Sequence, residues 1–348
     1  MNPTLKSAAR NLLTVLISMA ISLLVLEGAV RLLQTRRIYY DMEMWKYALR
    51  LKEKSDNPNL RHWHRPKAAA HLMGVDVAIN SKRLRDREYA YDKEPGVYRI
   101  VALGDSVTLG WGVPFEDTYA KVLEGRLNAG RKEGAPRFEV LNAGCGNWNT
   151  RQEVEFFKAE MRKYKPDLVL LGYFLNDAEP ILASNVDQSS WLNRSQLIVF
   201  FLTRWGKLRL SFNRELHFEN YYQALYQGPD WEACQQAFRE LADLTRADGT
   251  QLALVVLPDL HILDEERYPF KDIHGHVQNL ARANDVPFLD LFDTFKGRDL
   301  RELVVARDDA HHNARAHHLA AEALYRYLLE TFPVLREAQI PPAEQGGS

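Results

Sequence analysis

Cysteine is almost absent from this sequence, and neither sign of charge predominates. The 348 residues include two cysteines, Cys145 and Cys234, which are too few for a disulfide framework and lack the spacing of a metal site. The 45 lysines and arginines are balanced by 46 aspartates and glutamates, and the net charge of −1 gives no reason to expect nucleic acid as a partner. Internal repeats and low-complexity runs are also lacking. With 46% hydrophobic residues, the composition is that of a globular protein.

One long apolar run stands out near the N-terminus. As a helix, residues 11–33 would span roughly 34 Å at about 1.5 Å per residue, enough for a hydrocarbon core of about 30 Å. The triplet Ser18-Met19-Ala20 lies inside the run rather than after it, which favours an uncleaved transmembrane anchor over a cleaved signal peptide. Basic residues flank both ends of the run, so their count leaves the orientation open.

Strands and helices alternate between about residue 96 and residue 333. Continuous Val, Ile and Leu runs are typical of strands buried on both faces, and stretches of helical period separate them. Such alternation predicts an α/β domain with a mostly parallel sheet. The expected strands are 97–103, 138–142, 167–172, 251–257 and 286–291, and the expected helices are 118–128, 151–164, 231–247, 271–284 and 314–331.

Other segments fall outside this alternation. Residues 34–95 are rich in charges and aromatics and are expected to form a membrane-proximal connector that packs on the domain. Residues 177–229 form an insertion, in which the apolar and basic stretch 197–210 fits either an ordinary buried helix or a lid or interfacial element that touches membrane or an acyl chain. Residues 1–10 and 334–348 are expected to be tails, the second one flexible.

A serine follows the first expected strand. Ser106 would stand at the carboxyl end of a buried strand, where α/β proteins place their ligand crevices. A serine hydroxyl becomes a good nucleophile when an adjacent base removes its proton and a third group orients that base. His311 with Asp308, just before the last expected helix, can supply both groups, and Asp309 with His312 is the shifted alternative.

Donors for a developing oxyanion are also found at the ends of expected strands. The loop after the second strand offers the backbone amides of Gly146 and Asn147, and the loop after the third offers the side chain of Asn176. Together with the amide of Ser106, these groups would form a three-donor pocket, in which the choice between Gly146 and Asn147 stays open.

Taken in order, these motifs resemble the four sequence blocks of the SGNH (GDSL) hydrolases. They are Gly104-Asp105-Ser106, the glycine-bearing turn at 144–149, Gly172 through Asn176-Asp177, and Asp308-x-x-His311, within a resemblance that spans 99–331. The resemblance implies a flavodoxin-like three-layer fold with a five-stranded parallel sheet. It further implies Ser106 as nucleophile, His311 as base and Asp308 as its orienting partner, with an oxyanion hole from Ser106, a backbone amide of the second block and Asn176. Asn313 matches the same pattern and supports the pairing of Asp308 with His311.

The resemblance to membrane-anchored bacterial members of this family implies an esterase that works through an acyl-serine intermediate. We expect no metal and no cofactor, a small ester or acylated glycan as substrate, and a catalytic domain outside the cytoplasm, on the periplasmic side. An alternative is an O-acetyltransferase or deacetylase of cell-envelope polysaccharide, whose chemistry is the same until the acyl-enzyme meets water or a sugar hydroxyl. A non-catalytic carbohydrate-binding or assembly protein is a second alternative, against which the complete serine, histidine and aspartate set counts.

Overall fold

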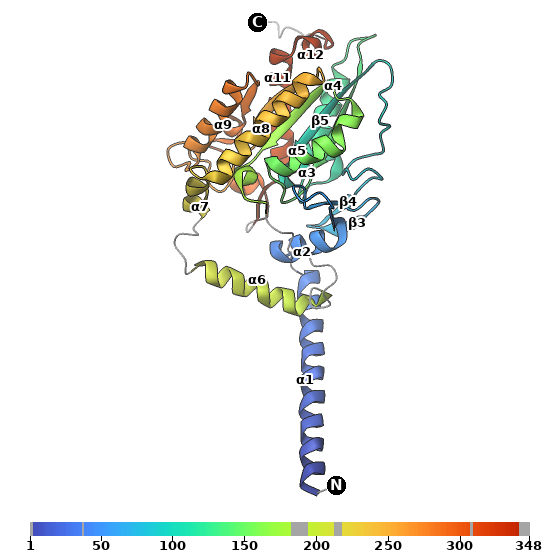
Figure 1. Cartoon of the computed structure of the whole chain (residues 1–348), viewed down its shortest axis with the longest axis vertical. Helices are drawn as coiled ribbons and strands as arrows, with labels where there is room; N and C mark the ends of the chain where they lie inside the picture. The colour runs from blue at the N-terminus through green and yellow to red at the C-terminus, as the bar shows by residue number, and fades with distance from the viewer. Residues whose placement is uncertain (1–2, 37, 182–193, 212–217, 307–308, 341–348) are drawn as a thin grey trace, which may run out of the picture.

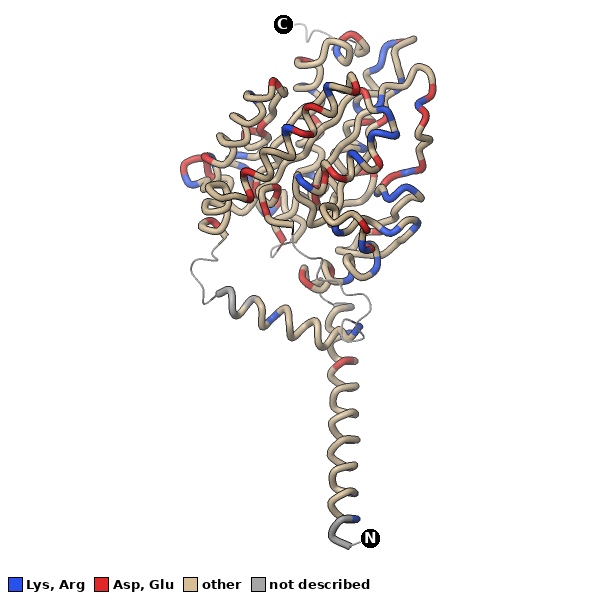
Figure 2. Tube along the Cα trace, viewed as in Figure 1, with Lys and Arg blue, Asp and Glu red and all other residues tan. Residues whose placement is uncertain are grey.

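A long helix and a globular domain make up the computed structural model, which describes residues 3–36, 38–181, 194–211, 218–306 and 309–340 (Figure 1). The helix, α1 (Pro3–Arg36), projects away from the domain. Within the described residues it is the single helix that is long and apolar enough to cross a membrane, with a mean hydropathy of 2.2 over its apolar part. Charged residues are spread over the whole domain but are rare along α1 (Figure 2).

The core of the domain is a five-stranded parallel sheet, as the sequence predicts. Its order is β6-β5-β7-β8-β9, which is the flavodoxin-like arrangement. Every residue of β5 is buried, as expected for a central strand covered on both faces. The strands are β5 (Val97–Gly104), β6 (Arg137–Gly144), β7 (Leu168–Tyr173), β8 (Gln251–Val256) and β9 (Phe288–Asp290).

Helices cover both faces of this sheet. Successive residues of a strand point to opposite faces, so Val101 and Leu103 of β5 join one core and Ile100 and Ala102 join the other. The first core is closed by α5 (Thr150–Ala159), α8 (Pro229–Ala247) and α9 (Lys271–Ala283), and the second by α4 (Tyr119–Ala129) and α11 (Ala314–Thr331). Two short helices, α10 (Phe292–Phe295) and α12 (Pro333–Glu337), complete the C-terminal part.

The segment between α1 and the sheet has regular structure of its own. It contains α2 (Tyr40–Leu51) and two antiparallel ribbons, β1 (Lys52–Lys54) with β2 (His62–His64) and β3 (Ala69–Leu72) with β4 (Val75–Ala78). Tyr47, Leu51 and Leu72 form a third small core with Trp111, which follows β5. The connector therefore packs on the domain near the carboxyl end of its central strand.

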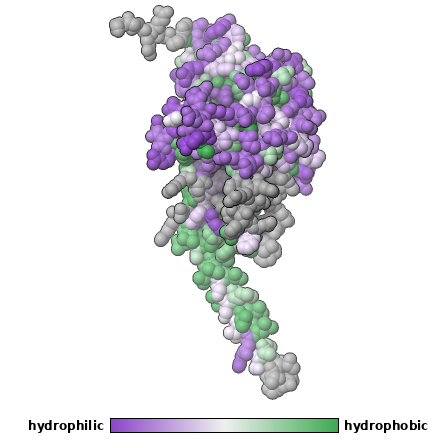
Figure 3. All heavy atoms as spheres, turned by 90° about the vertical axis from the view of Figure 1, so that its left-hand side faces the viewer, coloured by the Kyte–Doolittle hydropathy of each residue, from purple (hydrophilic) through white to green (hydrophobic). Residues whose placement is uncertain are grey.

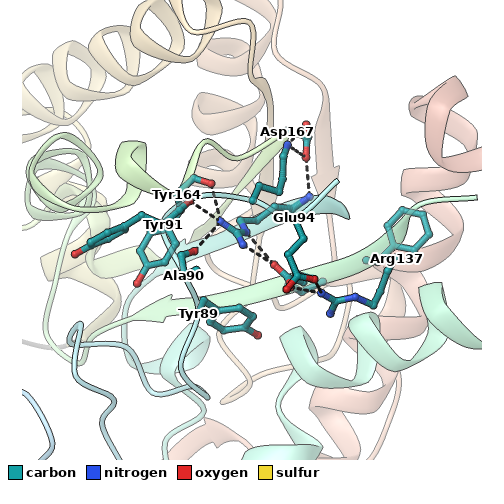
Figure 4. Close-up of polar contacts among 12 residues, drawn as sticks. Tyr89, Ala90, Tyr91, Glu94, Arg137, Tyr164 and Asp167 are labelled. Atoms are coloured by element: carbon teal, nitrogen blue, oxygen red, sulfur yellow. Dashed lines mark hydrogen bonds and ion pairs between the residues drawn. The ribbon is translucent and has the colours of Figure 1, made fainter. Parts of the chain in front are cut away.

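A buried arginine, Arg99, forms contacts near the amino end of β5. Arg99, 2% exposed, pairs with Glu139 of β6 and donates to the carbonyl oxygens of Ala90, Tyr91 and Tyr164 at 2.9–3.2 Å (Figure 4). Its guanidinium thus joins the connector, two strands of the sheet and the turn before β7. Removing one partner of such a buried pair typically costs about 3–5 kcal/mol, because the other charge is left uncompensated.

The insertion between β7 and α8 contains two helices, α6 (Gln196–Ser211) and α7 (Phe218–Leu225). Figure 1 shows α6 lying across the end of α1, beneath the domain. Glu27 of α1 accepts hydrogen bonds from the Ser195 hydroxyl and from the backbone N–H groups of Gln196 and Leu197, at 2.9–3.1 Å. This carboxylate therefore caps the first turn of α6 and fixes the two helices to each other.

Large apolar side chains of α6 face outward. Phe201, Leu202, Trp205 and Leu208 are each at least 49% exposed. An ordinary buried helix, one of the two interpretations of 197–210, would cover these side chains, and the structure does not show that arrangement.

Candidate active site

A pocket of about 330 Å³ opens at the carboxyl edge of the sheet. Segments that are distant in sequence meet there because parallel strands all end on the same side. Ser106 follows β5, Asn147 follows β6, Asn176 follows β7 and His261 follows β8, while His311 comes from a separate hairpin.

The serine, a histidine and a carboxylate form a continuous chain of contacts in this pocket. Ser106 is the first residue of the short helix α3 (Ser106–Leu109), and its Oγ lies 2.8 Å from Nε2 of His311. Nδ1 of His311 lies 2.5 Å from Oδ1 of Asp309, whose other oxygen accepts a 2.9 Å hydrogen bond from the Trp111 indole. Such a chain can take a proton from the hydroxyl while the carboxylate holds the imidazole in place.

The family resemblance implies Asp308 as the partner of His311. Asp308 lies outside the described residues, and the partner that the structure gives to His311 is Asp309. The shifted pair of Asp309 with His312 is not formed, because neither ring nitrogen of the buried His312 has a partner among the described residues. His311 lies on β11 (Asp309–His312), which pairs antiparallel with β10 (Val304–Ala306).

The environment of Asp309 favours its ionised form. Burial acts to raise the pKa of this carboxyl, but the hydrogen bond and charge of His311, together with the Trp111 hydrogen bond, outweigh burial and leave the pKa below its ordinary value. A carboxylate therefore stands beside Nδ1 of His311 at neutral pH.

The two candidate amides after β6 differ in direction. The N–H of Gly146 donates to the hydroxyl of Tyr47 at 2.9 Å, so it is already engaged away from the pocket. The carbonyl of Gly146 accepts a hydrogen bond from Nζ of Lys52 at 2.5 Å. Because a trans peptide is planar, the N–H of Asn147 in the same peptide points the opposite way from that carbonyl. Asn147 lines the pocket and has a left-handed φ of 64°, which turns the chain at this point.

Connector residues hold this loop in place, and sequence reasoning did not find them. His64 Nδ1 lies 3.1 Å from the carbonyl oxygen of Arg83, and Nε2 lies 2.7 Å from the Tyr47 hydroxyl. A neutral His64 therefore donates to Arg83 through Nδ1 and accepts a hydrogen bond from the Tyr47 hydroxyl through Nε2. Burial lowers the pKa of His64 to about 3, in keeping with a neutral ring. A Cβ at position 146 would come within 2.8 Å of the Tyr47 ring, which explains the glycine.

Lys52 adds a buried charge to the same loop. Besides the Gly146 carbonyl, its ammonium contacts Oδ1 of Asn147 at 3.0 Å. Burial lowers the pKa of Lys52 to about 8, so the ammonium is mostly charged at neutral pH. No local pattern in the sequence signals this role, since Lys52 and Gly146 are 94 residues apart.

Asn176 reaches the pocket from the loop after β7. Its Nδ2 lies 3.4 Å from the Trp148 carbonyl oxygen, which is a long hydrogen bond, and the side chain also hydrogen-bonds to the buried carboxyl of Asp105. The next residue, Asp177, is fully buried and accepts hydrogen bonds from the Phe174 N–H at 2.6 Å and from the Thr150 hydroxyl at 3.0 Å. These bonds fix the turn that presents Asn176.

Most of the chain matches one protein-family model. Residues 102–319 match the model of the GDSL-like lipase/acylhydrolase family. No curated protein matches the chain significantly. Similar solved structures include the acetyl xylan esterase AlAXEase (15% identity, 66% of this chain and 98% of that one, TM-score 0.43) and a catalytic mutant of Axe2, an acetylxylan esterase from Geobacillus stearothermophilus (18% identity, 66% and 94%, TM-score 0.43). Likenesses this distant say nothing about the substrate.

The two thiols are expected to be inert in the native protein. Both cysteines are fully buried, and burial raises the pKa of Cys145 to about 11 and that of Cys234 to about 12. Because the thiolate is the reactive form, native chain at pH 8 should take up less than about 5% of one equivalent of iodoacetamide in an hour, and two equivalents after denaturation, as counted by mass spectrometry. Rapid labelling of Cys145 in native protein would mean that the pocket exposes a second nucleophile.

Proposed function

The chain belongs to the GDSL-like lipase/acylhydrolase family and is a hydrolase of ester bonds, and we propose that it is a membrane-anchored serine esterase with Ser106 as its nucleophile. The observation that carries the proposal is the chain of contacts from Ser106 Oγ through His311 to Asp309 at the wall of the pocket.

In the acylation step, His311 Nε2 takes the proton of Ser106 as Oγ attacks the carbonyl carbon of the ester. The resulting tetrahedral intermediate collapses, the bond to the alcohol oxygen breaks, and His311 gives its proton to the departing alcohol. Asp309 holds the imidazole with Nδ1–H toward itself and stabilises the imidazolium that forms between these transfers. The product of this half-reaction is an acyl-serine at position 106.

In the deacylation step, a hydroxyl attacks the acyl-serine while His311 again takes its proton. With water the product is a carboxylic acid, and with a sugar hydroxyl it is a new ester. Ser106 leaves as the alcohol in both cases, with the proton returned by His311.

We assign the oxyanion contacts to the backbone N–H groups of Ser106 and Asn147 and to the side-chain amide of Asn176. Gly146 is not included, because its N–H is bonded to Tyr47. The charge of Lys52 on the carbonyl of the Gly146–Asn147 peptide polarises that peptide and makes its N–H a better donor. Donors fixed in this way before the reaction need no reorganisation when negative charge develops.

We further propose that α1 spans the bilayer and that α6 lies in its interface. The lipid-facing surface of α1 is apolar (Figure 3), and α6 leaves it at the level of Glu27 with Phe201, Leu202 and Trp205 exposed. A helix of this kind, apolar on its outer side with basic residues interleaved, suits the boundary between headgroups and acyl chains. Residues of α6 do not line the pocket, so within the described part of the chain its place favours anchoring over a lid.

Removal of the Ser106 hydroxyl is expected to abolish hydrolysis. The full chain in detergent should turn over p-nitrophenyl acetate, and Ser106→Ala should lower kcat/KM at least roughly 10³-fold, because no acyl-serine can form. A fluorophosphonate probe should label the wild-type protein and not the variant. Folded wild-type protein that neither hydrolyses the ester nor takes up the probe would refute the esterase. Product analysis by mass spectrometry, with and without a saccharide acceptor, separates hydrolysis from transfer.

The two adjacent aspartates give a matched pair of variants. Asp309→Asn removes the carboxylate bonded to His311 and should lower kcat roughly 10²–10⁴-fold with little change in KM, because the imidazolium loses its counter-charge. Asp308→Asn makes the same chemical change one residue earlier and should alter kcat by less than about threefold. A larger loss in Asp308→Asn than in Asp309→Asn would assign the orienting role to Asp308.

The side of the membrane can be mapped with introduced cysteines, since the native thiols are buried. Glu133 lies exposed on the domain and Ser7 lies at the start of α1. With the domain on the periplasmic side, a membrane-impermeant maleimide should label Glu133→Cys in intact spheroplasts and Ser7→Cys only after lysis. The reverse pattern would place the domain in the cytoplasm. Recovery of the full chain in the soluble fraction would refute the proposal that α1 is a membrane anchor.

A further inference from the structure

A second aspartate–histidine pair faces the pocket, and the proposed reaction does not use it. Asp259 and His261 follow β8, and both line the pocket together with Ser106 and His311. Asp259 Oδ1 accepts a hydrogen bond from the backbone N–H of His261 at 2.9 Å and lies 2.9 Å from its Nδ1. The pair has the same Asp-x-His spacing as Asp309 and His311, and in both pairs the aspartate engages Nδ1.

Buried hydrogen bonds hold Asp259 of this second pair in position. Asp259 is 3% exposed, and its backbone N–H donates to the Tyr268 hydroxyl at 3.2 Å. That hydroxyl lies 3.1 Å from Nε2 of His274, whose Nδ1 lies 2.8 Å from Asp290. A chain of three polar side chains therefore fixes the position of Asp259, and through it the ring of His261. Preorganisation of this kind is what a substrate-contacting group requires.

The two ring nitrogens of His261 differ in their contacts. Nδ1 is engaged by Asp259, which leaves Nε2, and no partner for Nε2 occurs among the described residues. The hydrogen bond that Asp259 accepts from Nδ1 raises the pKa of His261 above its ordinary value, which favours the protonated ring. Nε2 can accept a hydrogen bond in the neutral form and donate one in the protonated form, and a hydroxyl group can respond to either.

The surroundings of His261 combine aromatic rings with polar groups. Phe218 lies 5.2 Å from the His261 ring, and Tyr222 beside it donates its hydroxyl to Glu179 at 3.1 Å. All of these residues line the same pocket. A long acyl chain packed here would cover Glu179 and the exposed ring of His261 without giving them hydrogen bonds, which is costly. A ring that carries hydroxyl groups on its rim and C–H groups on its faces can satisfy both kinds of neighbour.

From this geometry we propose that the Asp259–His261 wall is the subsite for the alcohol half of the ester, and that the alcohol is polyhydroxylated, such as a sugar unit. His261 Nε2 would bond a hydroxyl next to the esterified one, with Phe218 against the ring. The inference rests on the proposed esterase function, and it adds to that function the class of the substrate and a specificity-determining residue.

The ratio of the kcat/KM values for two esters tests the proposed subsite. The full chain in detergent is assayed with a mono-O-acetylated methyl xyloside and with cyclohexyl acetate, which has a six-membered ring without hydroxyls. In His261→Phe, which keeps a flat ring against Phe218 but removes the nitrogens, the ratio of the two kcat/KM values should fall roughly 10- to 100-fold in favour of cyclohexyl acetate. His261→Gln, which retains a polar acceptor and donor, should recover part of the ratio.

The matched control is His318→Phe. His318 pairs with Asp117 at 2.9 Å and is 51% exposed, close to the 58% of His261, but it lies outside the pocket. This variant should leave the ratio within about twofold of the wild-type value. Fluorophosphonate labelling of Ser106 in each variant shows that the site is assembled.

The outcomes separate the two proposals. Wild-type protein that cleaves neither ester and resists the fluorophosphonate overturns the esterase and the subsite with it. Wild-type protein that cleaves cyclohexyl acetate but not the acetylated xyloside, or a ratio in His261→Phe equal to that of the wild type, overturns the subsite alone. As an independent measurement, Ser106→Ala should bind methyl xyloside in saturation-transfer NMR, and Ser106→Ala combined with His261→Phe should lose that signal.

Discussion

Three glycines in one row of the sheet make the site geometrically possible. Gly104 of β5 pairs in register with Gly144 of β6 on one side and with Gly172 of β7 on the other. A Cβ at Gly144 would come within 2.6 Å of the backbone of α3, and a Cβ at Gly172 within 2.7 Å of the Thr108 hydroxyl. Because none of the three has a side chain, α3 can lie directly against the strand ends. That close approach holds Ser106 at the edge where the loops after β6 and β7 also end.

The connector between α1 and the sheet belongs to the pocket as much as the strands do. Tyr40 lines the pocket beside His311, and Tyr47 and Lys52 hold the peptide between Gly146 and Asn147 from behind. All three residues come from one short stretch that follows α1 directly. The geometry of the loop after β6 therefore depends on how the chain emerges from α1.

Two aspartate–histidine pairs line the same pocket. His311, which Asp309 holds, contacts the serine, whereas His261, which Asp259 holds, lies beside the Phe218 ring in the same pocket. Burial of both aspartates is offset by hydrogen bonds on each carboxylate, so neither remains as an uncompensated charge. A pocket lined by both pairs is suited to the polyhydroxylated alcohol that we propose.

The sequence by itself determined the sheet, the covering helices and the place of Ser106. Buried parallel strands require continuous apolar runs such as 97–103, and the residues after them must lie at one edge, so Ser106, Asn176 and His311 could be assigned to a common site. The regular structure of the connector, the hairpin at 304–312 and the partner of His311 were decided only by the tertiary structure. The contact of Asp309 with His311 occurs where β10 pairs with β11, and the local sequence pattern does not show that pairing. The choice of Asn147 over Gly146 depends on Tyr47 and Lys52, about a hundred residues away, because contacts between distant side chains leave no periodicity in the chain.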